Sequence, residues 1–391
     1  MMKRIITRVH EKLFSFSFEK QTLKAIQYID ETNQGRMNSI YSATIKNIVP
    51  NIQSAFVEIE NGEICHYSLK NANPFFIKRM SPHKICIGDE IVVQLNRERI
   101  KTKSATVTDE LTLAGQYAVA VYGMNTIRFS SKINDSTFKE TIRENTKALL
   151  SKNIGFIVRT EALLCDNNQL LQEMIDLKKA LEAILETSLY RMGGIKIHEG
   201  IPEYITTLQN EYDTLEEIIT DEEAIYLALK GYERLFLKTR LYKDSYSLKA
   251  LYNLEHELEQ LLQKKVWLSS GAYLVIEQTE SLVAIDVNTG KAIHKKSADF
   301  FFEINKEAVN EIVRQIHLRE LSGIIMIDFI NMPSDIEEES LLKITKEKFN
   351  HDSTKTIVHG FTKLKLMEIS RQKKRQSLQE QLKQKVVDTH S

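Results

Sequence analysis

GAYLVIEQTESLVAIDV, residues 271–287, and GIIMIDFI, residues 323–330, are the stretches that decide the fold of the C-terminal part of this chain. Both have the apolar character of short strands, and the first reverses direction at the Thr-Glu-Ser of 279–281, which predicts a β-hairpin. An amphipathic helix is predicted between them, over about 299–320. The succession of strand, helix and strand predicts a parallel βαβ unit with a right-handed crossover.

Each of these strands carries an aspartate near its end. Asp286 and Asn288 share one face of the first strand because side chains alternate, and the crossover can place Asp328 on a neighbouring strand about 4.8 Å away. Converging oxygen ligands with open positions suit Mg²⁺, with Mn²⁺ as the alternative. The competing interpretation is that each aspartate merely caps the turn after it. The pairing by a βαβ unit favours the metal site.

Working towards the N-terminus, the stretch from about Ser39 to Ala114 holds five short β-rich runs separated by turn residues. Five such strands in so short a stretch predict a small barrel, most simply an OB-fold. The runs are SIYSATIKNIV, SAFVEIE, EICHYSL, DEIVVQLN and SATVTDEL.

The remaining segments mix helices and strands. Residues 115–203 predict an α+β unit, and 204–265 predict Leu-, Glu- and Lys-rich helices. After the βαβ unit we expect a helix near 335–349 and a strand, KTIVHGF. The segment from Lys363 to Ser391 holds eight Lys/Arg against three acids, and we expect its end, 376–391, to form a basic tail. The fold class is therefore mixed α+β with several subdomains.

Composition limits the function. The chain has 391 residues, 42% of them hydrophobic, enough for about two or three cores. Lys+Arg and Asp+Glu number 53 each, so nucleic acid must bind through local patches. The three cysteines lie too far apart for a CxxC zinc motif. With no signal peptide and no apolar run long enough for a membrane span, we expect a cytoplasmic protein without membrane contact.

The predicted barrel offers a surface for single-stranded nucleic acid. Phe56 and Tyr67 lie on two of its strands and can stack on unpaired bases. In NRERIKTKS, residues 96–104, alternating cations include Lys103 and suit phosphates. The alternative, about equally supported by these residues alone, is that Phe56 belongs to the core and the charges form a solvated edge.

Arg159 and Thr160 close the predicted strand GFIVRT. A planar guanidinium beside a hydroxyl can hold a terminal phosphate through several hydrogen bonds. The alternative is that Arg159 pairs with a nearby acid, Glu161 or Asp166, and only fixes the local fold.

These residues lie in motifs that resemble the ribonuclease E/G family. The most specific are GAYLVIEQTESLVAIDVNTGK and EAVNEIVRQIHLRELSGIIMIDFINM. Further similarity lies in IYSATIKNIVPNIQSAFVEI, KSATVTDELTLAGQYAV, GFIVRT and KLKLMEISRQKKRQSL, so the resemblance extends to about Leu378 and is weakest over 165–250.

The resemblance implies a metal-dependent endoribonuclease that cuts single-stranded RNA in RNA processing and messenger decay, leaving a 5′-phosphate on the downstream fragment. It assigns catalytic metal binding to Asp286 and Asp328, with support from Asn288. The family's RNA-binding residues match Phe56, Tyr67 and Lys103 of this chain. The residues with which the family senses a 5′-monophosphate match Arg159 and Thr160.

The same resemblance implies the domain organisation. Residues 1–36 and 204–265 would form a ribonuclease H-like subdomain, interrupted by an OB-fold domain at 37–114 and a 5′-sensor domain at 115–203. A catalytic α/β nuclease subdomain would occupy 266–375.

Some positions depart from the family pattern: Ser322, Asn331 and His317 replace a glycine, an acid and an arginine, which puts metal or phosphate binding in question. The family's zinc-link segment and small domain are not found before Ser391, so we expect no structural zinc, and any homo-oligomer would form without a zinc link. Two other functions stay open: a non-catalytic RNA-binding or ribosome-associated protein, and a DNA-directed nuclease, because a metal and a phosphate channel do not read the 2′-hydroxyl.

Overall fold

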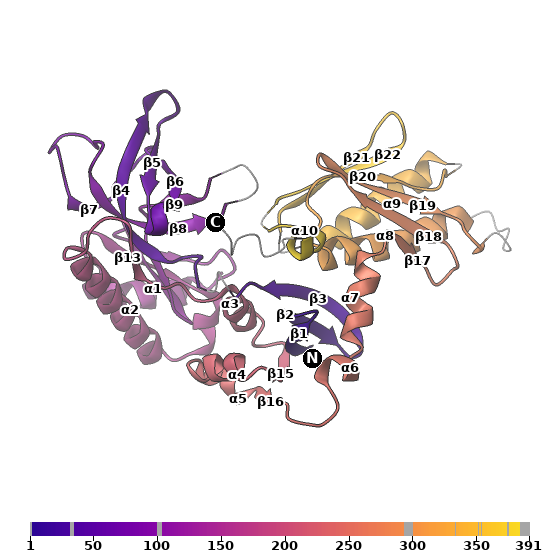
Figure 1. The fold of residues 1–391 in the computed structure, drawn as a ribbon, viewed down its shortest axis with the longest axis horizontal. Coiled ribbons are helices and arrows are strands. Elements are labelled where there is room, and N and C mark those ends of the chain that lie inside the picture. The colour runs from indigo at the N-terminus through magenta and orange to yellow at the C-terminus, as the bar shows by residue number, and fades with distance from the viewer. Residues whose placement is uncertain are drawn as a thin grey trace, which may run out of the picture. The chain divides into compact units, whose positions relative to one another are not determined.

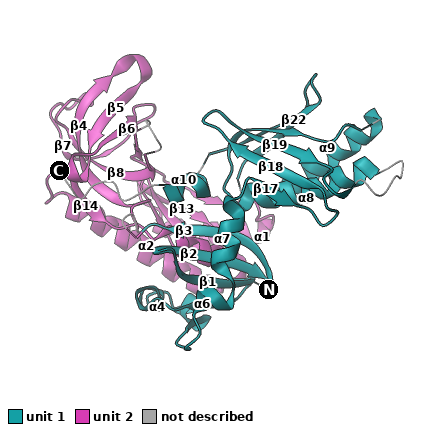
Figure 2. Ribbon diagram, turned by 45° about the vertical axis from the view of Figure 1, so that its right-hand side comes forward, with its two compact units in different colours: residues 1–30, 211–391 teal, residues 31–210 magenta. Residues whose placement is uncertain are grey.

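The computed structural model describes residues 2–31, 35–99, 104–292, 300–332, 334–350, 352, 354–373 and 375–383. The chain forms two compact units (Figures 1 and 2). Residues 31–210 form one unit, and residues 1–30 together with 211–391 form the other, so the first is an insertion in the second.

The inserted unit contains a closed five-stranded barrel. Strand β4 pairs with both β5 and β8, which closes the order β4-β5-β6-β9-β8. The barrel strands are the five runs that the sequence predicted, so the OB-fold is confirmed. They are β4 (Ile40–Val49), β5 (Ser54–Glu58), β6 (Ile64–Ser68), β8 (Glu90–Arg97) and β9 (Thr106–Thr108), flanked by β7 (Phe75–Lys78) and β14 (Ile195–His198).

The rest of this unit is a four-stranded sheet with helices. Glu173 on helix α2 (Asn167–Ser188) accepts hydrogen bonds from the backbone N–H groups of Gln116, Tyr117 and Ala118, which fastens the helix to the start of β11. The strand order is β10 (Thr112–Ala114), β11 (Ala118–Tyr122), β13 (Ile154–Val158) and β12 (Ile127–Phe129). The other helices are α1 (Ser136–Thr146) and α3 (Glu203–Asn210).

The second unit begins with a five-stranded sheet in which the N-terminal strands meet the chain returning after 210. Strand β1 pairs in parallel with β15, and the buried Arg4 donates to both carboxylate oxygens of Glu211. The order is β16 (Thr239–Leu241), β15 (Leu215–Thr220), β1 (Met2–Val9), β2 (Lys12–Glu19) and β3 (Thr22–Ile29). The accompanying helices are α4 (Glu223–Lys230), α5 (Glu233–Leu237), α6 (Leu248–Leu251) and α7 (Leu254–Leu262).

The C-terminal part of this unit is a six-stranded sheet with helices on one face (Figure 1). Ile285 and Ile327 of the strands share one apolar core with Ile312 of α8 and Leu341 of α9. The order is β17 (Lys265–Trp267), β18 (Tyr273–Gln278), β19 (Leu282–Asn288), β20 (Gly323–Asp328), β22 (Leu366–Arg371) and β21 (Thr356–Phe361). The helices on that face are α8 (Phe300–Leu318) and α9 (Asp335–Phe349), whereas the short α10 (Leu378–Lys383) buries Leu378 in the core of the five-stranded sheet.

Candidate active site

The two aspartates end neighbouring parallel strands. Strands β19 and β20 pair in parallel, and Asp286 lies directly opposite Asp328 in their register. Adjacent strands are about 4.8 Å apart, so the two carboxylates emerge side by side. Asn288, two residues further along β19, donates from Nδ2 to Oδ2 of Asp286 at 2.6 Å. The βαβ unit thus brings together the three residues singled out in the sequence.

Side-chain alternation explains why both acids face solvent. Ile285 and Val287 flank Asp286 and are buried against the helices, as Ile327 and Phe329 are on either side of Asp328. The acids therefore point to the opposite face and are exposed. We call this side of the six-stranded sheet, opposite the face that α8 and α9 cover, the open face. An exposed acid pair avoids the large desolvation cost that burial would impose.

A buried asparagine fixes the chain after Asp328. Asn305 on α8 is fully buried, accepts from the backbone N of Ile330 at 3.1 Å and donates to the Ile330 carbonyl at 2.7 Å. These bonds hold the segment two residues beyond Asp328 against the helix. The sequence reasoning missed Asn305, whose signal was a polar residue on the apolar side of the predicted helix.

The donor set fits a hard divalent cation. Mg²⁺ is commonly held by one or two carboxylates and substrate phosphates and keeps several waters. Asp286 and Asp328 supply two such carboxylates, and the hydrogen bond from Asn288 orients one of them. Among the described residues there is no group of three or more His, Cys, Asp or Glu side chains placed to hold a metal. The pair therefore suits a metal with open positions.

On the barrel, the register separates the two aromatic candidates. Phe56 lies opposite His66, whereas Tyr67 lies opposite Ala55 on the other face of the same strands. The Tyr67 ring is 1% exposed in the barrel core, and its hydroxyl donates to Asp109 at 3.0 Å. Burial, together with Asp109, raises the pKa of Tyr67. A buried ring cannot stack on a base, so the structure places Tyr67 in the core rather than in an RNA-binding surface.

Phe56 is half-buried on the outer side of the barrel and meets His66 edge to face, with ring centroids 6.1 Å apart. His66, which the sequence reasoning overlooked, is therefore the aromatic partner of Phe56. Strict alternation along EICHYSL would have shown that His66 and Tyr67 face opposite ways. Lys103 lies outside the described residues; Arg97 and Arg99, earlier in the same basic run, are exposed.

Arg159 follows strand β13 and is already engaged. Its Nη1 donates to the Gly115 carbonyl and its Nη2 to Oδ1 of Asn210, each at 2.9 Å. Its Nε lies 3.4 Å from a carboxylate oxygen of Glu161. Thr160 donates to the Ser130 hydroxyl at 3.1 Å. Arg159 and Thr160 thus both have polar partners within the protein, and a terminal phosphate would have to compete with them.

Comparison with known proteins places this arrangement in a family. The model of the ribonuclease E/G family matches residues 112–374, more than half of the chain. The chain belongs to the ribonuclease E/G family.

Its relatives include ribonuclease G of Haemophilus influenzae, 29% identical over 92% of this chain and 77% of its own length. Ribonuclease G of Escherichia coli K12 is 27% identical over 91% of this chain and 77% of its own length. Ribonuclease E of Synechocystis is 26% identical over 93% of this chain and 57% of its own length. Membership of the ribonuclease E/G family supports an endoribonuclease role in RNA processing and decay.

Two of the three positions that depart from the ribonuclease E/G pattern lie apart from the acid pair. His317, on α8, has its Nε2 3.4 Å from Oδ2 of the buried Asp352 and meets Phe349 edge to face. Gly323 needs glycine, because its φ is +91°, whereas Ser322 has no positive φ. Asn331 is exposed after β20. Neither His317 nor Ser322 lies beside the two aspartates.

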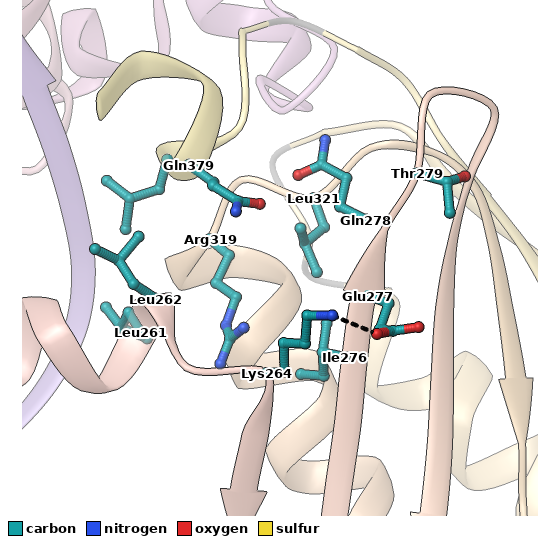
Figure 3. Close-up of a pocket in the computed structure, with 11 residues that line it drawn as sticks. Leu261, Leu262, Lys264, Ile276, Glu277, Gln278, Thr279, Arg319, Leu321 and Gln379 are labelled. Atoms are coloured by element: carbon teal, nitrogen blue, oxygen red, sulfur yellow. Dashed lines mark hydrogen bonds and ion pairs between the residues drawn. The ribbon is translucent and has the colours of Figure 1, made fainter. Parts of the chain in front are cut away.

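A cavity of about 270 Å³ lies near Gln278, at the end of β18 away from Asp286 (Figure 3). Arg319 lines it, is 8% exposed, and donates from Nε to Gln315 at 2.6 Å. Its Nη2 has no hydrogen-bond partner among the described residues. Burial lowers the pKa of Arg319 to about 10. Neither aspartate lines this cavity, so it is separate from the candidate active site.

Among the residues that the structure describes, no helix combines the length and the apolar character needed to cross a bilayer.

Proposed function

We propose that this chain is a metal-dependent endoribonuclease that cleaves single-stranded RNA and leaves a 5′-phosphate on the downstream fragment. The observation that carries the proposal is the register of β19 and β20, which sets Asp286 opposite Asp328 on an exposed face, in a chain of the ribonuclease E/G family. This arrangement favours a nuclease over a non-catalytic RNA-binding protein, since RNA binding alone does not need two adjacent carboxylates that repel phosphate.

In the proposed mechanism, Asp286 and Asp328 would hold Mg²⁺, and Asn288 keeps the Asp286 carboxylate oriented through its hydrogen bond. When bound, the ion polarises the scissile phosphate and lowers the pKa of the attacking water. Asn305 holds the chain after Asp328 in place, which keeps the second carboxylate beside the first. Hydrolysis adds the water oxygen to phosphorus and releases the 3′-oxygen, which takes up a proton. The downstream fragment would begin with a phosphate if the 3′-oxygen is the leaving group.

Cleavage assays test this function. The purified chain is incubated with labelled single-stranded RNA and with DNA of the same sequence, in Mg²⁺, in Mn²⁺ and in EDTA. We expect cleavage of RNA with either metal, none in EDTA, and product ends that a 5′-phosphate-dependent ligase accepts. Binding of RNA without cleavage in any divalent metal would favour the binding protein, and equal cleavage of DNA would favour the general nuclease.

We also propose that Arg159 and Thr160 bind the 5′-monophosphate of the substrate, with Phe56 and Lys103 contributing to RNA binding on the barrel. A terminal phosphate carries more charge than an internal phosphodiester, so it can compete with Glu161 for the guanidinium. A charge-assisted hydrogen bond contributes about 1.5–3 kcal/mol, which corresponds to a preference of roughly ten- to a hundredfold.

Replacing Arg159 tests this sensing role. Arg159→Ala should erase the preference for 5′-monophosphorylated over 5′-hydroxyl RNA while leaving the slower substrate nearly unchanged, chiefly through the Michaelis constant. Glu161→Gln is the matched control, since removal of the competing carboxylate should strengthen the preference. Equal losses on both substrates in Arg159→Ala would mean that the residue only fixes the local fold.

A further inference from the structure

A second cluster lies on the open face, at the edge of the same sheet. Lys265 and Trp267 are on the edge strand β17, and Tyr273 is on the adjacent β18. The Lys265 ammonium lies 4.1 Å from the centroid of the Trp267 ring and 3.6 Å from that of Tyr273. The two rings are tilted by 60°, with centroids 5.2 Å apart. We call these three residues the aromatic shelf.

The register connects the shelf to the two aspartates. Trp267 pairs with Tyr273, and Tyr273 pairs with Asn288, so these three side chains form one row across β17, β18 and β19. In the neighbouring row, Lys265 pairs with Val275, which pairs with Asp286, which pairs with Asp328. Because strands are about 4.8 Å apart, Lys265 lies roughly 10 Å from Asp286 along the sheet. The shelf and the acids therefore share one continuous surface.

The shelf is not needed to build the core. Val266 and Leu268, which flank Trp267, pack towards the helix-covered face, whereas Trp267 is 53% exposed. Trp267 is also the single tryptophan of the chain. A large exposed ring on an edge strand gains little from folding, since its apolar area stays in water. Its placement is better explained by a ligand that covers it.

RNA that approaches the two aspartates needs a cation nearby to offset their negative charge. Asp286 and Asp328 repel the phosphates of any RNA that approaches them, and Lys265 is the cation in their row. The lysine ammonium sits on a flexible stem, so it can pair with a phosphate and leave a ring face to a base. Proteins bind single-stranded nucleic acids with aromatic rings next to a cation: the bases stack on the rings, and the cation neutralises phosphate charge.

We infer that the aromatic shelf is a nucleotide subsite of the nuclease: a base of single-stranded RNA stacks on Trp267, the tilted ring of Tyr273 packs beside it, and Lys265 contacts its phosphate. The subsite holds a nucleotide close to the phosphodiester that lies over Asp286 and Asp328. This inference rests on the proposed function. Since every base has a flat face, stacking here selects single strands without selecting one base strongly.

The single tryptophan supplies a direct readout. A short unlabelled RNA strand is titrated into the wild-type protein in EDTA, so that no cleavage occurs, while the fluorescence of Trp267 is recorded. We expect saturable quenching with the same midpoint as the anisotropy change of labelled RNA of that sequence. A DNA strand shows whether the stack reads the sugar, and a strand with abasic sites should bind with much less quenching.

Variants then test the contribution to affinity. Trp267→Ala should weaken binding of the short strand by about 5- to 150-fold, and Trp267→Phe should restore part of it. Lys265→Met should lower the salt dependence of binding by about one phosphate contact. Tyr246→Ala is the matched control, because Tyr246 is 60% exposed in the same unit, and it should leave affinity unchanged.

The outcomes separate the subsite from the proposed function. Binding of RNA without quenching, or an unchanged affinity in a folded Trp267→Ala, overturns the subsite even if the protein cleaves RNA. Quenching by RNA without cleavage in any metal supports the subsite and overturns the nuclease. A change in tryptophan fluorescence with protein concentration alone would show a second copy of the chain on the shelf, and would also overturn the inference.

Discussion

The six-stranded sheet holds carboxylates in two contrasting ways. The side chain of Asp352, after α9, is 2% exposed and accepts hydrogen bonds from Arg371 at 2.8 Å and Thr356 at 2.7 Å. Asp286 and Asp328 are exposed, and among the described residues no cation pairs with either of them. An acid that the protein satisfies by itself serves the fold, whereas two exposed acids on adjacent strands can take an external cation.

The electrostatics of Asp352 follow from its contacts. Burial opposes its ionisation, but the nearby His317 ring and hydrogen bonds from Arg371, Thr356 and the backbone of Thr354 outweigh burial and hold the pKa of Asp352 well below its usual value. Arg371 is itself 5% exposed in its side chain, so the two charges depend on one another. Removal of one partner from such a pair leaves a buried charge unpaired.

The largest expected effect on stability is therefore at Asp352. Asp352→Asn should lower the free energy of unfolding by about 3 kcal/mol, because the buried Arg371 would lose its nearer carboxylate and keep the Leu321 carbonyl at 3.0 Å and the Glu320 carboxylate at 3.6 Å. Urea unfolding at neutral pH measures the loss. Asp286→Asn is the matched control, and since that acid is exposed beside another carboxylate, its replacement should leave stability within about 0.5 kcal/mol. Equal losses in both variants would show that Asp352 contributes no more to stability than Asp286.

The pH dependence sharpens the same contrast. The pKa of Asp352 is lower in the folded than in the unfolded chain, so its stabilising contribution is fully present above about pH 4 and is lost as the pH falls further. The stability gap between wild type and Asp352→Asn should therefore shrink below about pH 4. A gap that stays constant or widens under acid would show that the pair with Arg371 is not its source.

A smaller effect should separate Tyr67 from Phe56 in the same manner. Tyr67→Phe removes the buried hydrogen bond to Asp109 and should cost about 1 kcal/mol of stability without changing affinity for RNA. Phe56→Ala should weaken RNA binding by about 1–3 kcal/mol if its half-exposed ring stacks on a base. Thermal unfolding and RNA titrations of both variants measure these changes. Weaker RNA binding by Tyr67→Phe would contradict the core position of that ring.

Periodicity and topology explain what could be predicted from the sequence. Alternation along LVAIDVN and GIIMIDF, with a helix between them, was enough to predict that Asp286 and Asp328 lie on adjacent strands. The five barrel strands were likewise marked by turn residues. Tyr67 was misassigned because its face depends on the pairing of β5 with β6, which the turn between them sets. Asp352 and Arg371 were not singled out, since their pairing requires the loop after α9 to meet the end of β22.

The aromatic shelf could not be predicted from the sequence for the same reason. No local sequence pattern marks Lys265, Trp267 and Tyr273. Only the order and register of the strands show that Trp267 and Tyr273 lie in one row with Asn288, and that Lys265 lies in the row of Asp286. Cross-strand neighbours in a sheet arise from register rather than from local sequence.

We propose above all that Asp286 and Asp328 form the catalytic metal site. The most direct test is the cleavage rate of Asp328→Asn on single-stranded RNA at saturating Mg²⁺. Thermal unfolding checks that the variant is folded. We expect the cleavage rate to fall by about 100-fold or more, while thermal unfolding and RNA binding stay normal. The reason is that the ion stabilises charge that develops at the phosphate and is not needed to dock the strand. Cleavage by folded Asp328→Asn at the wild-type rate would contradict it.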